Sequence, residues 1–111
     1  MPTITQETID QVKAKHSGAE LHLLTATVRG DRHEVIVKCP SAAEYQEFRD
    51  YLSDDGKKTR AYERLVRSCV VHPEMAGLDA LLAQKPGLST TFGSELTNIA
   101  GAVEDVEAKK L

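Results

Sequence analysis

Two side chains of this sequence have the spacing of a cysteine nucleophile and its base. Cys69 and His72 are separated by two residues, and a cysteine nucleophile needs a thiolate held close to a base. Cys69, however, shares an apolar stripe of helical spacing with Leu65 and Val66. We therefore predict a buried structural thiol. An enzyme that uses Cys69 and His72 is the least favoured of three functional hypotheses.

The histidines and cysteines do not form a recognisable metal motif. The chain holds four His and two Cys. Zinc sites use about four nitrogen or sulfur ligands with paired short spacings. His22 is expected to face Cys39, but no second short-spaced pair accompanies Cys69 and His72. The sequence therefore predicts no metal, no cofactor and no catalytic residues.

Charge and apolar patterning limit the class of protein. The 111 residues contain 14 Lys and Arg against 17 Asp and Glu, a net charge of -3, which argues against nucleic-acid binding through phosphate charge. No run approaches the roughly 18 consecutive apolar residues of a membrane span, and the N-terminus lacks the pattern of a signal peptide. We expect one domain over residues 1–111 that acts in the cytoplasm, without a membrane and with reduced cysteines.

A short amphipathic helix is expected in residues 1–18 and a β-hairpin in residues 20–39. Gly30 and Asp31 form a pair suited to a two-residue turn. A turn at these residues predicts four cross-strand pairs on the buried face: Val28 with His33, Ala26 with Val35, Leu24 with Val37 and His22 with Cys39.

Residues 41–107 carry apolar residues at helical spacing. Ser41 and Glu44 form a capping box, which predicts the start of a helix. Further stripes predict helices over residues 57–71, 75–82 and 88–106. Because two strands alone are marginally stable, the hairpin must pack on the helices. The predicted fold class is α+β and mostly α, with an N-terminal helix and a β-hairpin packed against a four-helix C-terminal part.

The first two of these helices carry opposite charge. Residues 44–55 hold five acids and one base, whereas residues 57–67 hold five bases and one acid. One interpretation makes Arg60, Arg64 and Arg67 a contact for nucleic acid or an acidic protein. The other makes the helices an antiparallel pair whose charges meet across the contact, and the negative net charge favours it.

The last apolar stripe also has two interpretations. Leu88, Phe92, Leu96 and Ile99 could be buried core, or they could offer an amphipathic face to a partner. Such a stripe is usually core. Gly93 weakens the helix by about 1 kcal/mol relative to alanine, which would leave the segment mobile until a partner orders it.

The order of several short segments resembles a known family. The segments are Ser41-Ala42-Ala43-Glu44-Tyr45, Phe48, Leu65-Val66-Arg67-Ser68-Cys69-Val70-Val71-His72-Pro73, Lys85-Pro86-Gly87-Leu88 and Gly101. Across residues 20–104 this order resembles tail assembly chaperones of long-tailed bacteriophages and prophages. The resemblance implies a small, non-enzymatic α+β protein that binds the long helical tape measure protein and keeps it soluble while tail tube subunits polymerise around it.

The functional prediction is therefore a tail assembly chaperone in the host bacterial cytoplasm, with the tape measure protein as partner and the tail tube protein as a second one. The predicted contact surface combines the stripe with the basic edge: Leu88, Phe92, Leu96, Ile99, Arg60, Arg64 and Arg67. On this hypothesis, Phe92→Asp weakens client binding without unfolding the protein. The alternative is a small nucleic-acid-binding regulator that uses the helix from Lys57 to Arg67. Self-association is favoured because a hairpin has two unpaired edges.

Overall fold

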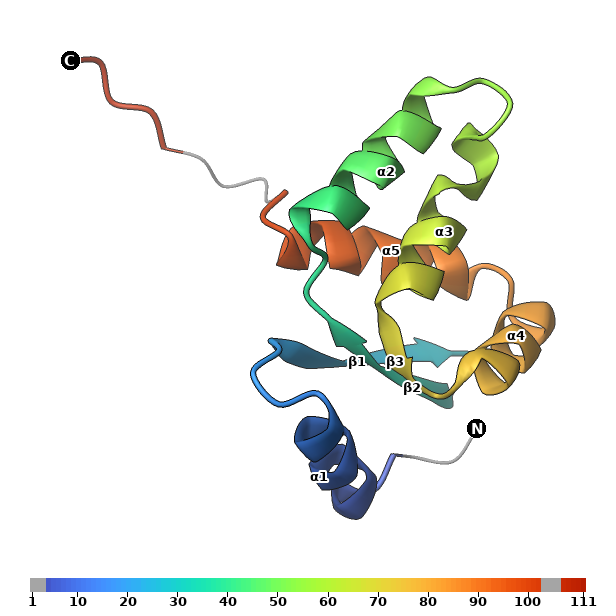
Figure 1. The fold of residues 1–111 in the computed structure, drawn as a ribbon. Helices are drawn as coiled ribbons and strands as arrows, with labels where there is room; N and C mark the ends of the chain where they lie inside the picture. The colour runs from blue at the N-terminus through green and yellow to red at the C-terminus, as the bar shows by residue number, and fades with distance from the viewer. Residues whose placement is uncertain (1–3, 103–106) are drawn as a thin grey trace.

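The computed structural model describes residues 4–102 and 107–111, and the first of these ranges folds as a small sheet between two helical layers (Figure 1). Within this part the elements follow the order predicted from the sequence, with one added strand and a short 3-10 helix. Their bounds are α1 Gln6–Lys15, β1 Leu21–Val28, β2 Asp31–Lys38, α2 Ala42–Ser53, η1 Lys58–Arg60, α3 Ala61–Cys69, β3 Val70–His72, α4 Met75–Gln84 and α5 Leu88–Ile99. The fold is α+β and mostly helical, as predicted.

The hairpin of β1 and β2 turns one residue earlier than predicted. The two-residue turn is Arg29-Gly30, with φ of 51° and 88°. A turn with positive φ at both central residues matches the twist of a hairpin, and glycine adopts that φ at low cost. The predicted register is therefore wrong by two residues, since Ala26 pairs with His33 and Leu24 with Val35. A shift of two keeps every side chain on its face, so the predicted buried face is correct.

A third strand, β3, was not predicted. The expected helix over residues 57–71 ends at Cys69, and Val70–His72 pairs antiparallel with β2. The strand order is β1-β2-β3, so β3 covers the second edge of β2. Strand β1 forms one edge of the sheet as a consequence.

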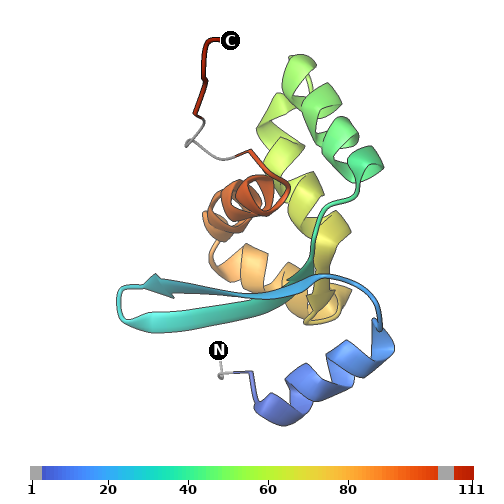
Figure 2. The same ribbon diagram turned by 90° about the vertical axis from the view of Figure 1, so that its left-hand side faces the viewer.

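Helices cover the two faces of the sheet unequally (Figure 2). Helices α2 to α5 lie on one side, where Leu24, Val35 and Val37 of the sheet join the main core. Helix α1 lies on the other side and contributes Val12. The turn end of the hairpin extends beyond the helices on both sides (Figure 2).

Glu34 ties the N-terminal segment to the sheet. This carboxylate is buried on the α1 side of β2. Its oxygens accept the Ile4 N–H at 2.9 Å and the Thr25 hydroxyl at 3.0 Å. A buried carboxylate without such donors is costly, so the three groups stabilise one another in this position.

The predicted capping box at the start of α2 is confirmed. The Ser41 hydroxyl accepts the Glu44 N–H at 3.1 Å, and the Glu44 carboxylate accepts the Ser41 N–H at 2.9 Å. Helices α2 and α3 then pack as the expected pair, with Phe48 and Tyr62 rings 5.2 Å apart between centroids. Few residues separate the two helices, so the chain reverses its direction soon after Ser53 and α3 packs beside α2.

Helix α5 lies against α3, and Gly93 permits their close approach. A Cβ atom at this position would lie 2.8 Å from Tyr62 Cβ. Gly93 therefore has a packing role between α3 and α5, in place of the expected role of keeping the last helix mobile. The helix ends at Ile99, and Gly101 follows with φ of 107°, a common helix end. The predicted continuation to 106 includes positions 103–106, which lie outside the described residues.

Candidate protein-binding site

The structure separates the two residues of the nucleophile hypothesis. Cys69 is fully buried in the main core, and burial raises the pKa of its thiol to about 12. A thiol with so high a pKa holds almost no thiolate at neutral pH. His72 instead lines an open hollow against α1, together with Lys15 and Glu74. The pair has neither the ionised sulfur nor the common pocket that catalysis needs.

No metal centre is formed by the described residues. Within residues 4–102 and 107–111, no group of three or more His, Cys, Asp or Glu side chains lies close enough to hold a metal ion. Cys39 lies at the end of the hairpin, where its thiol faces the Ile99 carbonyl at 3.9 Å. Burial, with the nearby carboxylates of Glu20 and Glu44, raises the pKa of the Cys39 thiol. Both cysteines are free thiols.

The predicted apolar contact surface is wrong for three of its four residues. Leu88, Phe92 and Leu96 are exposed by at most 2% and belong to the main core. Ile99 is half-buried and packs against the same core. The stripe is thus the inner face of α5, and we expect Phe92→Asp to unfold the protein because it places a carboxylate in this core.

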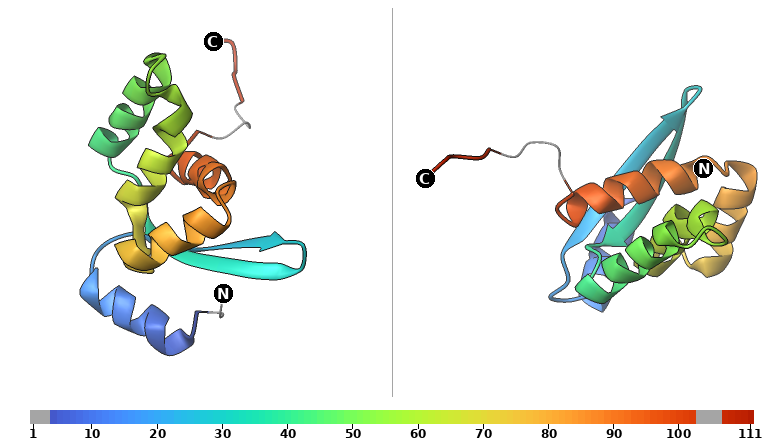
Figure 3. Two further views of the ribbon diagram at one scale, coloured as in Figure 1. Left: turned by 90° about the vertical axis from the view of Figure 1, so that its right-hand side faces the viewer. Right: turned by 90° about the horizontal axis from the view of Figure 1, so that it is seen from above.

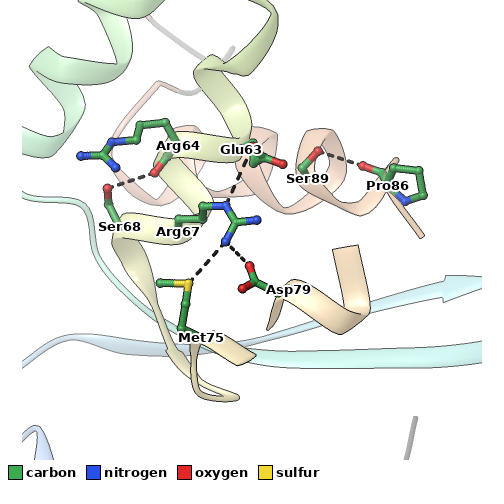
Figure 4. A network of polar contacts seen from close by, with 8 residues as sticks. All are labelled: Glu63, Arg64, Arg67, Ser68, Met75, Asp79, Pro86 and Ser89. Atoms are coloured by element: carbon green, nitrogen blue, oxygen red, sulfur yellow. Dashed lines mark hydrogen bonds and ion pairs between the residues drawn. The ribbon is translucent and has the colours of Figure 1, made fainter. Parts of the chain in front are cut away.

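The basic edge is largely engaged within the protein. Arg64 Nε donates to Glu47 Oε1 at 2.5 Å, which joins α3 to α2. Arg67 donates to Asp79 of α4, and its Nε lies 3.9 Å from Glu63 (Figure 4). Arg60 is exposed at the start of α3. The Arg64–Glu47 pair is the contact that the antiparallel-pair interpretation predicted, whereas Arg67 meets an acid of α4, which that interpretation did not include.

An apolar groove lies between α1 and the edge strand β1. Its volume is about 310 Å³, and Leu23 beside it is 45% exposed. Apolar side chains of α1 and of the sheet line the groove, together with polar side chains of α1 and β1. The α1 groove, as we call it, is lined by Gln6, Ile9, Lys13, Leu21, His22, Leu23 and Ile36.

A second hollow lies on the opposite face of the same strand. Helix α5 crosses over the hairpin (Figure 3), and a space of about 290 Å³ remains between the helix and β1. The α5 hollow is lined by Leu23, Leu24, Thr25, Thr91, Phe92 and Glu95. We call the edge of β1, together with the hollow on each of its two faces, the β1-edge site.

Sequence reasoning did not single out the β1-edge site. One signal was present, because the run from Leu21 to Val28 contains no charged residue. To locate the site, one must also know which edge of the hairpin β3 covers. The sequence does not reveal this strand, because its three residues follow directly after helix α3. The periodicity of Cys69 and Val70 continues the helical stripe, so sequence pattern alone placed them in one element.

The described part of the chain contains no helix long and apolar enough to cross a membrane. Fold and site together define a small α+β domain, with an antiparallel three-stranded sheet between helical layers and a candidate binding site at one sheet edge.

The chain belongs to the family described as Domain of unknown function (DUF6848), whose model matches residues 12–109. A similar solved structure is that of a protein described as uncharacterised, RBSTP2171 from Bacillus stearothermophilus. It has a TM-score of 0.75 and 22% sequence identity, and the match covers 91% of this chain and 99% of that chain. No curated protein matches the chain. The neighbour confirms the α+β fold.

Proposed function

We propose that this protein is a non-enzymatic tail assembly chaperone that binds the tape measure protein in the host bacterial cytoplasm. The sequence resemblance described above supplies the identity of the client. The single observation that supports binding at this surface is the β1-edge site, where an apolar groove lies beside an exposed leucine and an uncharged strand.

A protein client suits this site better than a small molecule or nucleic acid. The α1 groove is open and lies at the small end of the range for ligand pockets, about 300–1,000 Å³. It has room for a few apolar side chains of a longer segment. Lys13 is one cation at its rim, whereas phosphate binding uses several. Arg64 and Arg67, two of the three arginines of the predicted basic edge, are already engaged with acids.

The physical need for such a chaperone follows from the client. A long helical protein exposes apolar stripes until its partners assemble around it, and exposed apolar patches of this kind aggregate. A shallow site with a modest apolar area binds an exposed segment of the unassembled client reversibly, so that the tail tube protein can displace the chaperone as it polymerises.

Coexpression with the tape measure protein tests this proposal. We expect wild-type protein to keep the client in the soluble fraction after centrifugation and to copurify with it. Ile9→Lys places a charge in the α1 groove and should remove most of this effect. Leu52→Lys, at a 43% exposed leucine on α2, is the control and should behave as the wild type.

Two kinds of result would overturn the proposal, one seen in the solubility of the client and the other in what copurifies. One is a client that stays insoluble with wild-type protein or is equally soluble with Ile9→Lys. The other is copurification of nucleic acid in place of the client, detected from the absorbance spectrum of the eluate and lost in Arg60→Glu. Circular dichroism of each variant establishes that it is folded.

A further inference from the structure

The open edge of β1 presents main-chain groups in a regular row. The Cys39 N–H donates to the Glu20 carbonyl at 3.0 Å, which fixes the alternation of the β1–β2 ladder. In an antiparallel pair every second residue bonds to the partner strand, so the residues between point their N–H and C=O groups away from it. Within the described part of the chain, no main-chain hydrogen bond reaches these outward groups. They belong to Leu21, Leu23, Thr25 and Thr27.

This edge lacks the devices that usually protect an edge strand. Monomeric proteins blunt exposed edges with charged residues, proline, bulges or very short strands. Strand β1 has eight residues, none of them charged and none proline. Its pairing with β2 runs through the whole strand without a register shift. The edge is thus ready to pair with a further strand.

The two hollows of the β1-edge site lie where such a strand would place its side chains. Successive side chains of a strand point to opposite faces of the sheet. The α1 groove opens on one face, the α5 hollow opens on the other, and Leu23 lines both. A strand laid along β1 would therefore direct alternate side chains into the two hollows.

We propose that β1 binds an extended segment of a partner protein as a fourth strand of the sheet. The segment carries apolar side chains toward the α1 groove, which Ile9, Leu21 and Ile36 line. On the other face it carries a basic side chain, because Glu95 is the charged residue of the α5 hollow. Main-chain bonds supply affinity in this mode of recognition, and the pockets for alternate side chains supply specificity. The inference rests on the proposed function only in assigning this surface to a protein partner.

A second copy of the chain fits this edge less well. Two copies that pair through β1 are related by a twofold axis near the middle of the strand. Helix α5 passes over that point, since Thr91 and Phe92 line the α5 hollow with Leu24. Such a pair would therefore bring the α5 helices of both copies, each with Glu95 at the hollow, toward the same axis. A lone extended segment brings no second α5 helix and no second Glu95 to the edge.

Selection from a random peptide display library on wild-type protein tests the inference without the proposed client. We expect enriched peptides with apolar residues at every second position and a basic residue between them. Leu23→Lys should lower their affinity at least tenfold, while Leu52→Lys, a matched leucine of 43% against 45% exposure, should leave it unchanged. Thr27→Pro removes an outward N–H and should also weaken binding.

Amide hydrogen exchange with one selected peptide gives a second readout. Binding should slow exchange of the Leu23 and Thr25 amides, whereas those of Leu24 and Ala26, which already bond to β2, should change little. Peptides with apolar spacing of three and four, protection elsewhere on the protein, or a peptide-free dimer that Leu23→Lys dissociates would each overturn the inference. If peptide binding follows these expectations and the tape measure protein is not solubilised, the binding mode stands and the client assignment fails.

Discussion

Replacing Gly93 with alanine measures how closely α3 and α5 pack. The added Cβ would lie 2.7 Å from Tyr62 Cδ1 and 2.8 Å from Tyr62 Cβ. Carbon atoms attract one another best at about 3.5–4.0 Å, so the helices must separate by roughly 1 Å to accept the methyl group. Rotation of the tyrosine ring relieves the contact with Cδ1 and leaves the contact with Cβ, which is fixed to the backbone.

The expected change in stability is a difference of two effects. Overpacking of a well-packed core costs about 1–3 kcal/mol. Alanine in a helix interior gains about 1 kcal/mol over glycine. We expect the free energy of unfolding to fall by about 1 kcal/mol and at most about 2 kcal/mol. For a domain of this length that lowers Tm by about 4 °C per kcal/mol.

Gly87→Ala is the matched control at the start of the same helix. Gly87 has φ of -64°, and an added Cβ meets no atom within 4 Å. Alanine at such a position stabilises by about 0.4–1 kcal/mol, through a smaller entropy of the unfolded chain. Urea unfolding followed by far-UV circular dichroism compares the variants. A Gly93→Ala protein as stable as Gly87→Ala would refute the close packing of α3 and α5.

Three further predictions concern a buried carboxylate, a buried thiol and a helix cap. Glu34→Ala should lower the free energy of unfolding by about 1–3 kcal/mol because it leaves the Ile4 N–H without its acceptor, and unchanged stability in urea would contradict this. Thiol labelling of the folded protein should modify Cys69 only at the rate of unfolding, and fast labelling would revive a reactive thiol at this position. Burial alone would raise the pKa of Glu44, but the bonds from its helix cap and from Lys38 outweigh it and lower this pKa. The resulting stability is present above the ordinary glutamate pKa of about 4.3 and is lost as pH falls through the lower folded value, so the advantage of wild type over Glu44→Gln should shrink from about pH 7 to about pH 3. An advantage that grows on acidification would contradict it.

Local rules of the sequence predicted most elements because they act over a few residues. The capping box at Ser41 and the buried face of the hairpin depend on neighbours three or four positions away, or on simple alternation. The hairpin register failed on a finer point. Gly30 suits either the first or the second position of a two-residue turn, and the structure places it second, after Arg29 with φ of 51°.

The candidate site depended on contacts that no local rule contains. Whether the stripe around Phe92 is core or surface is decided by where α3 and the sheet lie in space. Likewise, the sequence pattern assigns Arg67 to a basic surface, whereas in the structure α4 places Asp79 beside it. The open edge of β1 follows from the pairing of β2 with β3, across more than thirty residues of sequence.

The placement of α1 links binding at the β1-edge site to local folding. Helix α1 contributes one buried residue, Val12, and is held to the sheet partly through Glu34 and Ile4. A layer with so few buried contacts opens at a lower free energy than the main core, so α1 detaches before the rest unfolds. Three residues of the α1 groove, Gln6, Ile9 and Lys13, leave with it. The groove is therefore present only in the fraction of molecules in which α1 is docked, and apparent affinity scales with that fraction. By the same linkage, a partner that fills the groove stabilises the docked form of α1. It therefore protects the whole helix from exchange and proteolysis, including the residues of α1 that do not line the groove.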